Sequence, residues 1–366
     1  MALVRPSRPA LTPLAPLLRR LLLGACTLFL ACTKTSATDP FLPNGDRLKF
    51  QSQITNVVAG NTIQPFKVQI VDTGGTLVTT ARVTDISLSL DSTDPRDTLF
   101  GATVVQTQSG EATFANLLLK RSVSSMRIVA TAKGLTGVTS LAFNISVGVP
   151  AKLAFSVQPT TVIAGEKMVP APRVVVQDAV GNLIPNDSGL VVLQVLTGPN
   201  STPRNNAVNA VNGSAKFDSL RITAANTPAA ATYTLQAVGP QGRNLVAAVS
   251  NVFTVSPSAP FKLFFTTGPT TSVVNSAINP PIGVTITDSM SNVVTVFNKP
   301  VTLALDVNPT GATLGGSTTV NASGGVATFS GISIDLVSPA GSGYRLRAVT
   351  ATVPDTARSG FFAIVP

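Results

Sequence analysis

Few side chains in this sequence could carry out acid–base or metal chemistry. Its 366 residues include no histidine and two cysteines, and only two of its 16 acidic residues are glutamates, Glu111 and Glu166. Without histidine there is no imidazole base and no Ser-His-Asp triad, and two cysteines cannot complete a structural zinc site. No Ser-x-x-Lys, Walker-type or dinucleotide-binding pattern occurs. We therefore expect no enzyme, no cofactor and no small-molecule substrate.

Acidic residues are densest in one segment, where Asp91, Asp94 and Asp97 lie close together with Arg96 between them. Carboxylates are suitable ligands for Ca²⁺, but this ion takes about six to eight oxygens, and Arg96 would neutralise part of the negative charge. We interpret the segment as a solvated loop. The three aspartates are the candidate ligands if the chain binds a metal, which we do not expect.

Three other aspartates recur at matching places. Asp72, Asp178 and Asp288 each end a run of alternating character, VQIVD, VVVQD and VTITD. An aspartate side chain can accept a hydrogen bond from the backbone two residues further on and so fix a tight turn. A calcium ligand is the alternative, but only one carboxylate recurs per turn. We therefore expect these three aspartates to be structural turn residues.

The aspartates belong to a larger repeat that must position them. Three copies carry the same blocks in the same order, and the clearest blocks are GEATFANL, GSAKFDSL and GVATFSGI, which begin at Gly110, Gly213 and Gly325. The spacing in sequence between equivalent blocks of successive copies is therefore about the length of one small domain. Most blocks alternate between apolar and polar residues, which is the period of a half-buried strand, and threonine, valine and isoleucine dominate them.

This pattern predicts an all-β fold. Six or seven short strands within about 100 residues, separated by glycine, proline and asparagine, are typical of a β-sandwich. We expect a tandem array of three such domains, at residues 46–148, 151–256 and 260–366. Proline in the short connections predicts that the domains stand end to end.

Two sets of recurring positions have an expected structural role. By alternation, the phenylalanines near the start of each copy face the core; these are Phe50, Phe155 and Phe265. A few residues after each of these phenylalanines, an equivalent position holds glycine or asparagine, which tolerate a positive φ angle. The residues at that position are Gly60, Gly165 and Asn275.

The order of the blocks resembles bacterial immunoglobulin-like domains of the invasin and intimin type. The shared pattern is V-x-V-x-D-x-x-G-N, an alternating strand, G-x-A-x-F and Y-x-L-x-A, and the second copy matches it best. The first copy has Met126 in place of the tyrosine, and the third lacks the turn glycine, so we expect these places to be built differently. The resemblance implies immunoglobulin-like sandwiches that serve as surface rods and spacers, and as adhesion tips in some members.

Residues 1–31 have the layout of an export signal. The basic residues end at Arg20, and an apolar run from Leu21 to Ala31 follows. This run is shorter than the roughly 20 residues that span a bilayer, but it suits the apolar region of a secretory signal. The sequence Phe29-Leu30-Ala31-Cys32 resembles the lipid-attachment motif of bacterial lipoproteins, which implies a lipid anchor on Cys32. Cys26 is the alternative attachment residue.

Residues 32–45 are rich in threonine, serine and proline, and we interpret them as a flexible tether. Arg19-Arg20 leaves the twin-arginine route open beside the general secretory route. The net charge of +10 includes four arginines of the signal, so the chain from Cys32 carries 22 basic and 16 acidic residues, a net of +6. These charges are dispersed and the chain has no tryptophan, which argues against a nucleic-acid partner.

These features together predict a non-enzymatic, lipid-anchored protein of the bacterial cell envelope, either an outer-membrane lipoprotein or a cell-surface protein. It would act as an immunoglobulin-like rod in adhesion or as a structural spacer. Its partners would be the membrane, through the anchor, and an envelope or host-surface protein or glycan. The alternative is a binding module for a glycan or an envelope polymer.

Overall fold

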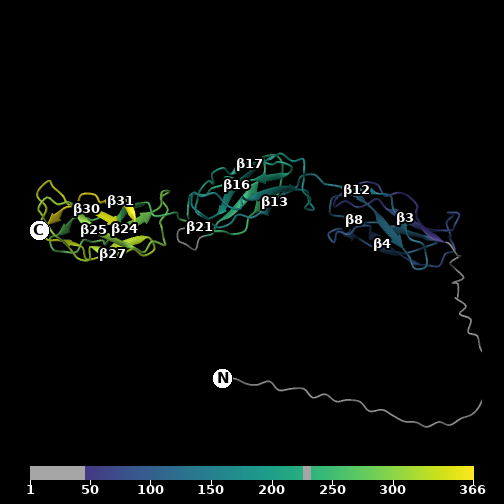
Figure 1. The fold of residues 1–366 in the computed structure, drawn as a ribbon, viewed down its shortest axis with the longest axis horizontal. Coiled ribbons are helices and arrows are strands. Elements are labelled where there is room, and N and C mark those ends of the chain that lie inside the picture. The colour runs from purple at the N-terminus through teal and green to yellow at the C-terminus, as the bar shows by residue number, and fades with distance from the viewer. Residues whose placement is uncertain (1–45, 226–231) are drawn as a thin grey trace, which may run out of the picture.

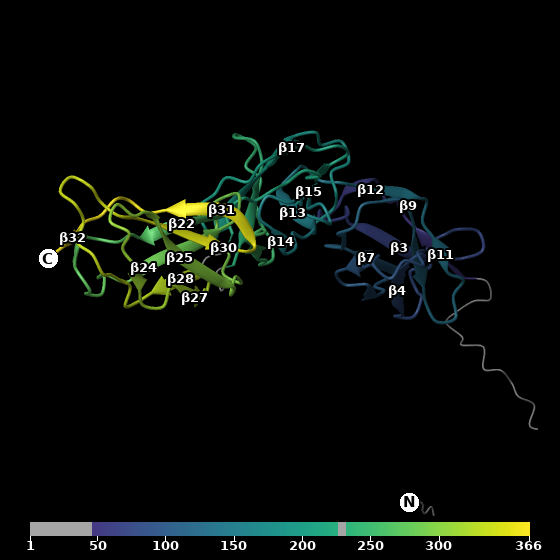
Figure 2. The ribbon, with the colours of Figure 1, turned by 60° about the vertical axis from the view of Figure 1, so that its left-hand side comes forward.

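The computed structural model describes residues 46–225 and 232–366. The expected signal, the tether, Cys26 and Cys32 lie outside these residues. Three β-sandwiches follow one another in a row (Figure 1), and a second view keeps the same order (Figure 2); we name them sandwiches 1, 2 and 3 in chain order. The described residues contain no helix, so none of them forms a helix that could span a membrane. The all-β prediction is confirmed.

The strands are short, as expected from the frequent turn residues. Sandwich 1 contains β1 (Arg47–Phe50), β2 (Val57–Val58), β3 (Phe66–Val71), β4 (Asp85–Leu90), β5 (Leu99–Phe100), β6 (Val104–Gln106), β7 (Glu111–Phe114), β8 (Leu118–Leu119), β9 (Val123–Met126), β10 (Ile128–Thr131), β11 (Val138–Thr139) and β12 (Phe143–Ser146). Sandwich 2 contains β13 (Lys152–Val157), β14 (Val162–Ile163), β15 (Arg173–Gln177), β16 (Leu190–Thr197), β17 (Ala207–Asn209), β18 (Ser214–Lys216), β19 (Thr234–Val238), β20 (Ala248–Val249) and β21 (Val255–Ser256). Sandwich 3 contains β22 (Lys262–Thr267), β23 (Ser272–Val273), β24 (Ile282–Thr287), β25 (Pro300–Val307), β26 (Leu314–Gly315), β27 (Thr319–Asn321), β28 (Val326–Phe329), β29 (Ser333–Ile334), β30 (Arg345–Thr350), β31 (Val353–Arg358) and β32 (Ile364–Val365).

Each sandwich pairs a three-stranded sheet with a four-stranded sheet. These three-stranded sheets have the orders β1-β3-β7, β13-β15-β18 and β22-β24-β28, and the four-stranded sheets have the orders β11-β10-β4-β6, β17-β16-β19-β20 and β27-β25-β30-β31. Sandwich 1 has a further three-stranded sheet, in the order β2-β12-β9. A short parallel pair, β2–β12, β14–β21 or β23–β32, joins the start of each sandwich to its end. This division of antiparallel strands between two sheets is that of immunoglobulin-like sandwiches.

A second immunoglobulin-like feature appears in sandwiches 2 and 3. Tyr233 and Tyr344 stand just before β19 and β30, and both are fully buried. The Tyr233 hydroxyl donates to the Ala224 carbonyl at 2.7 Å, and the Tyr344 hydroxyl donates to the Leu336 carbonyl at 3.0 Å. This is the geometry of a tyrosine corner. Sandwich 1 lacks it because Met126 occupies the position and packs in the core instead.

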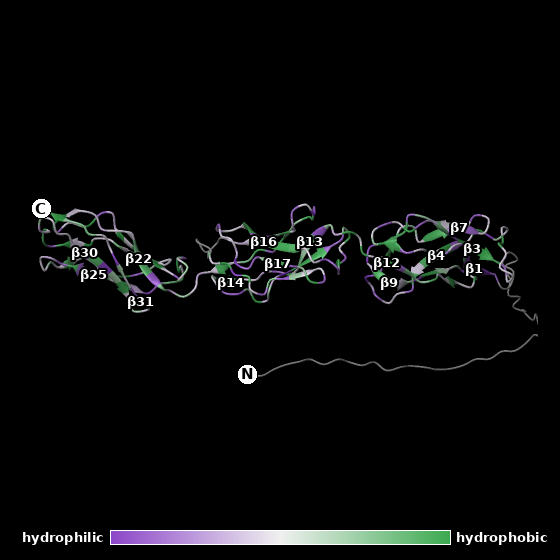
Figure 3. Cartoon of the chain, turned by 90° about the horizontal axis from the view of Figure 1, so that it is seen from above, coloured by the Kyte–Doolittle hydropathy of each residue, from purple (hydrophilic) through white to green (hydrophobic). Residues whose placement is uncertain are grey.

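The apolar side chains form one separate cluster in each sandwich, and Figure 3 shows apolar residues along the strands of all three. Phe50 is 5% exposed, as expected of a core residue. Phe155 and Phe265, in contrast, are only partly buried at the edge of their clusters. In both β13 and β22 the pairing register shifts directly after this phenylalanine, so the strand departs from simple alternation at that point.

Candidate functional site: the joints between sandwiches

Specific polar contacts connect each sandwich to the next at the place where the two meet. We call the contact between sandwiches 1 and 2 joint 1 and that between sandwiches 2 and 3 joint 2. Each joint combines the turn that follows the recurring aspartate, the chain that connects the two sandwiches, and a loop of the preceding sandwich. The turns are Asp178–Asn182 and Asp288–Asn292.

Asp178 fixes its own turn and also binds the connecting chain. Its Oδ1 accepts hydrogen bonds from the N–H groups of Val180, Gly181 and Asn182 at 2.8–3.1 Å. Its Oδ2 accepts one from the Gly148 N–H at 3.0 Å and one from the Asn182 Nδ2 at 2.8 Å. Burial alone would raise the pKa of Asp178, but the hydrogen bonds from Gly148, Asn182 and Gly181 outweigh it and hold the pKa below its ordinary 3.8.

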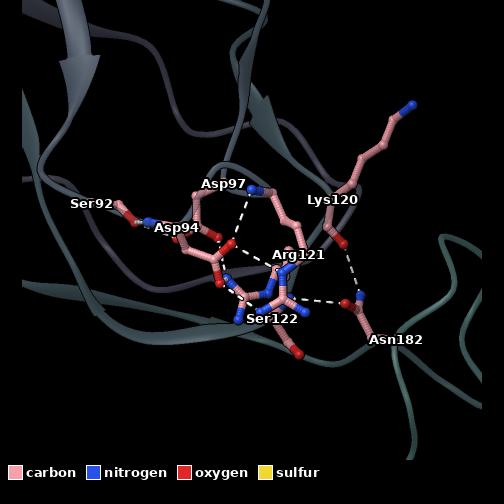
Figure 4. A network of polar contacts seen from close by, with 8 residues as sticks. Ser92, Asp94, Asp97, Lys120, Arg121, Ser122 and Asn182 are labelled. Carbon is pink, nitrogen blue, oxygen red and sulfur yellow. Dashed lines mark hydrogen bonds and ion pairs between the residues drawn. The ribbon is translucent and has the colours of Figure 1, made fainter.

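Asn182 reaches across joint 1 to the preceding sandwich. Its Nδ2 donates to the Lys120 carbonyl at 2.8 Å, and its Oδ1 accepts from the Ser122 N–H at 3.0 Å. Figure 4 shows Asn182 facing this loop. A carboxamide that donates to one peptide group and accepts from another replaces the pairing a neighbouring strand would provide. Asn182 thus acts as a two-point clasp between the sandwiches.

Joint 2 repeats this construction. Asp288 Oδ2 accepts from the Ser258 N–H of the connection at 2.9 Å. The Asn292 side chain donates to the Thr223 carbonyl and accepts from the Ala225 N–H, both at 2.8 Å. The pKa of Asp288 is also lowered, because hydrogen bonds, first that of the Asn292 side chain, outweigh the effect of burial.

The third turn is not built differently, contrary to expectation. Ser291 takes a φ of 69° where Gly181 has 102°. Asp288 Oδ1 accepts from the N–H groups of Met290 and Asn292 at 2.9 Å, as Asp178 does in the second turn. Positive φ costs a serine little enough that the hydrogen bonds of the turn can impose it.

Each joint also contains an apolar contact with a glycine. The Val180 side chain packs against the core of sandwich 1, and a Cβ placed on Gly60 would lie 2.7 Å from Val180 Cγ1. In joint 2 a Cβ on Gly165 would overlap the end of the Met290 side chain. Both glycines have the expected positive φ, 85° and 81°. They therefore have a second role that the sequence did not indicate, which is to leave room for the turn of the next sandwich.

The turn of sandwich 1 is simpler. Asp72 Oδ1 accepts from the Thr76 N–H at 2.9 Å, which closes the turn. Gly74 stands where the other turns have Val180 and Met290, and Thr76 stands where they have asparagine. This turn has the recurring aspartate without the groups that dock in the joints.

The acidic segment supports joint 1. Arg121 donates to Asp97 at 2.6 Å and contacts Asp94 at 2.9 Å (Figure 4). Asp94 also pairs with Arg96 at 2.6 Å. These pairs hold Arg121 within the loop that contacts Asn182. The Asp97 side chain is only 4% exposed, so the segment is less solvated than we expected, whereas Asp91 is exposed. Hydrogen bonds from the Arg96 side chain and backbone hold the pKa of Asp94 well below its usual range.

The remaining candidates for chemistry have structural partners. Glu111 lies opposite Gln69 in the sheet, and its carboxylate accepts from Lys67 at 2.7 Å and from Gln69 at 2.6 Å. Hydrogen bonds, first that of Lys67, lower its pKa. Within residues 46–225 and 232–366, no three histidine, cysteine, aspartate or glutamate side chains are grouped to hold a metal ion.

Comparison with known proteins adds few firm points. No protein-family model matches the chain, and no curated protein is similar to it in sequence. Among solved structures, the chain is similar to the Escherichia coli adhesin FdeC, with 16% identity, 87% of this chain and 96% of that chain covered, and a TM-score of 0.33. It is also similar to invasin, a bacterial integrin-binding protein, with 12% identity, 83% and 56% covered, and a TM-score of 0.30. A third is surface layer protein SbsC, domains 4–9, with 14% identity, 88% and 47% covered, and a TM-score of 0.23. Invasin is the type of protein that the sequence motifs resemble. Because the three TM-scores are low, the fold is assigned from the strand order of the sheets and not from these similarities.

Proposed function

We propose that the chain is a stiff immunoglobulin-like rod of the bacterial cell envelope, which acts in adhesion or as a structural spacer. The observation that carries this proposal is the repeated joint, in which a buried aspartate and a clasping asparagine fix each sandwich to the one before it. A domain with a radius of gyration of about 13 Å has a diameter of about 35 Å, so three in a row would reach about 100 Å.

We further propose that Cys32 carries a lipid anchor on an exported chain, with Cys26 as the alternative residue. The support is the sequence of residues 1–31. The test is fractionation of cells that produce the full chain. The wild type and Cys26→Ala should stay with the membrane, and Cys32→Ala should be released. Release by Cys26→Ala alone would assign the anchor to Cys26, and retention of both variants would contradict a lipid anchor.

Small-angle X-ray scattering of the released Cys32→Ala chain tests the rod. A maximum dimension of about 100 Å or more, with a narrow cross-section, is expected. A compact particle, in which the sandwiches fold back on one another, would contradict the proposal.

A second candidate function is binding of a glycan or an envelope polymer. One observation favours it, the presence of three arginines on the outer sheet face of sandwich 3. They are Arg345, Arg347 and Arg358.

A further inference from the structure

On the outer face of each four-stranded sheet, three neighbouring strands each contribute one residue to a row of directly opposed side chains. The row lies at the same register in all three sandwiches. In the first two sandwiches this row is uncharged, and in sandwich 3 it contains two arginines. The rows are Ser89–Val129–Thr139, Gln194–Gln236–Val249 and Ala304–Arg347–Arg358. Like charges directly opposite one another destabilise a sheet, so this pair has a cost that the other two sandwiches avoid.

The charge around this pair is only partly balanced. Asp306, on β25, contacts Arg345 at 2.6 Å and Arg358 at 3.3 Å. Asp355, on β31, accepts the N–H of Thr356. Arg347 is exposed, and no ion pair holds its guanidinium within the described residues. Two of the three guanidinium groups therefore share the Asp306 carboxylate, and Arg347 has no carboxylate partner among the described residues.

An exposed aromatic ring extends this surface toward the far end of sandwich 3. Phe361 is 63% exposed, and the Arg345 guanidinium lies over its ring at 5.0 Å. We call Phe361, Arg345, Arg347 and Arg358 the arginine strip.

The strip has the chemistry of a site for an anionic sugar chain. Guanidinium groups present planar pairs of donors that match carboxylates, and opposed residues on antiparallel strands stand about 5 Å apart. An exposed phenyl ring can pack against the apolar face of a sugar ring. We propose that the strip binds an acidic polysaccharide, with carboxylates on Arg347 and Arg358 and a sugar ring on Phe361. This inference rests on the second candidate function and names its ligand class.

Other polyanions fit the strip less well. Single-stranded nucleic acid is bound by several stacking aromatics within a basic groove, whereas the strip has one aromatic ring on a sheet face. Anionic membranes are typically recognised by clusters of about four to eight lysines and arginines, and the strip has three.

The test uses the released Cys32→Ala chain and an oligogalacturonate, with its neutral methyl ester as the comparison ligand. Titration calorimetry should show binding of the acid and not of the ester. Arg347→Gln with Arg358→Gln should weaken binding at least tenfold and should not lower the unfolding temperature, because it removes the like-charge pair. Arg47→Gln with Arg127→Gln changes the net charge equally on exposed sites of sandwich 1 and should change affinity less than twofold.

Four results would overturn the proposal, and the first three concern specificity. They are equal binding of acid and ester, no loss of affinity in the Arg347 and Arg358 double variant, and tighter binding of single-stranded DNA or phosphatidylglycerol vesicles than of the acid. No binding of any acidic glycan would overturn it too. Scattering from the same samples reports the rod separately, so the failure of the ligand site and the failure of the rod can be distinguished.

Discussion

Replacing Asn182 by alanine should loosen joint 1 and leave both sandwiches folded. The change removes the hydrogen bonds that cross the joint, from Nδ2 to the Lys120 carbonyl at 2.8 Å and from the Ser122 N–H to Oδ1 at 3.0 Å. It also removes the bond to Asp178 Oδ2 within the turn. The other turn bonds of Asp178 use backbone N–H groups and would remain.

The size of the effect follows from these bonds. A hydrogen bond contributes about 0.5–1.5 kcal/mol net, so losing the two that cross the joint weakens docking by about 1–3 kcal/mol. This raises the ratio of undocked to docked joint by about 5- to 150-fold. Asn182→Asp should have a larger effect, because a carboxylate cannot donate to the Lys120 carbonyl and would place a second negative charge beside Asp178.

The distance distribution between two spin labels measures this loosening. With both native cysteines replaced, cysteines at the exposed Gln108 and Gln241 place one label on each side of joint 1. We expect a narrow distribution for the parent and a broad one for Asn182→Ala. Thr76→Ala, at the same turn position of sandwich 1, should leave the distribution narrow. Unchanged widths in both Asn182 variants would refute the clasp.

Three further predictions follow from the same structure. Gly60→Ala should broaden the joint 1 distribution because its Cβ would meet Val180, whereas Gly75→Ala, with a similar φ of 86° and no atom within 4 Å of its Cβ, should not. Tyr344→Phe should lower the free energy of unfolding of sandwich 3 by about 1–3 kcal/mol in chemical denaturation, since the hydroxyl's hydrogen bonds with the Leu336 carbonyl and the Thr310 hydroxyl are both lost. The lowered pKa of Asp288 means that its stabilisation of joint 2 is present above the ordinary aspartate pKa of about 4 and is lost as the pH falls through the folded-state value, which scattering at steps downward from pH 5 would detect as bending.

The strands and cores were predictable because alternation reports which face of a strand is buried. Phe114, Phe217 and Phe329 stand at the same place in the Gly-led block, and all are at most 1% exposed. Alternation placed Phe155 and Phe265 on the core side but overestimated their burial, because the register shift after each one is invisible in a two-residue period.

The joints were not predictable in the same way. Asn182 is visible in the sequence as the last residue of the turn motif, and turn formation already explains an asparagine there. Its docking role depends on backbone groups at Lys120 and Ser122, far earlier in the chain, and no side-chain pattern marks those groups. The arginine strip was missed for a related reason. Arg347 and Arg358 belong to different strands, and only the pairing of β30 with β31 places them opposite each other.

Differences between the copies nevertheless separate the demands of a turn from those of a joint. Asn275 stands at the equivalent position of sandwich 3 with a φ of 61°, so positive φ alone does not require the glycine found at Gly60 and Gly165. At those two glycines a Cβ would meet the turn of the following sandwich, at Val180 and at Met290. Similarly, Thr76 closes the turn of sandwich 1, which has Gly74 in place of the apolar residue and no carboxamide. Both joints thus have an apolar residue and an asparagine in the turn and a glycine facing that turn, whereas a turn can form without them. We therefore assign these three residues to docking between sandwiches and not to turn formation.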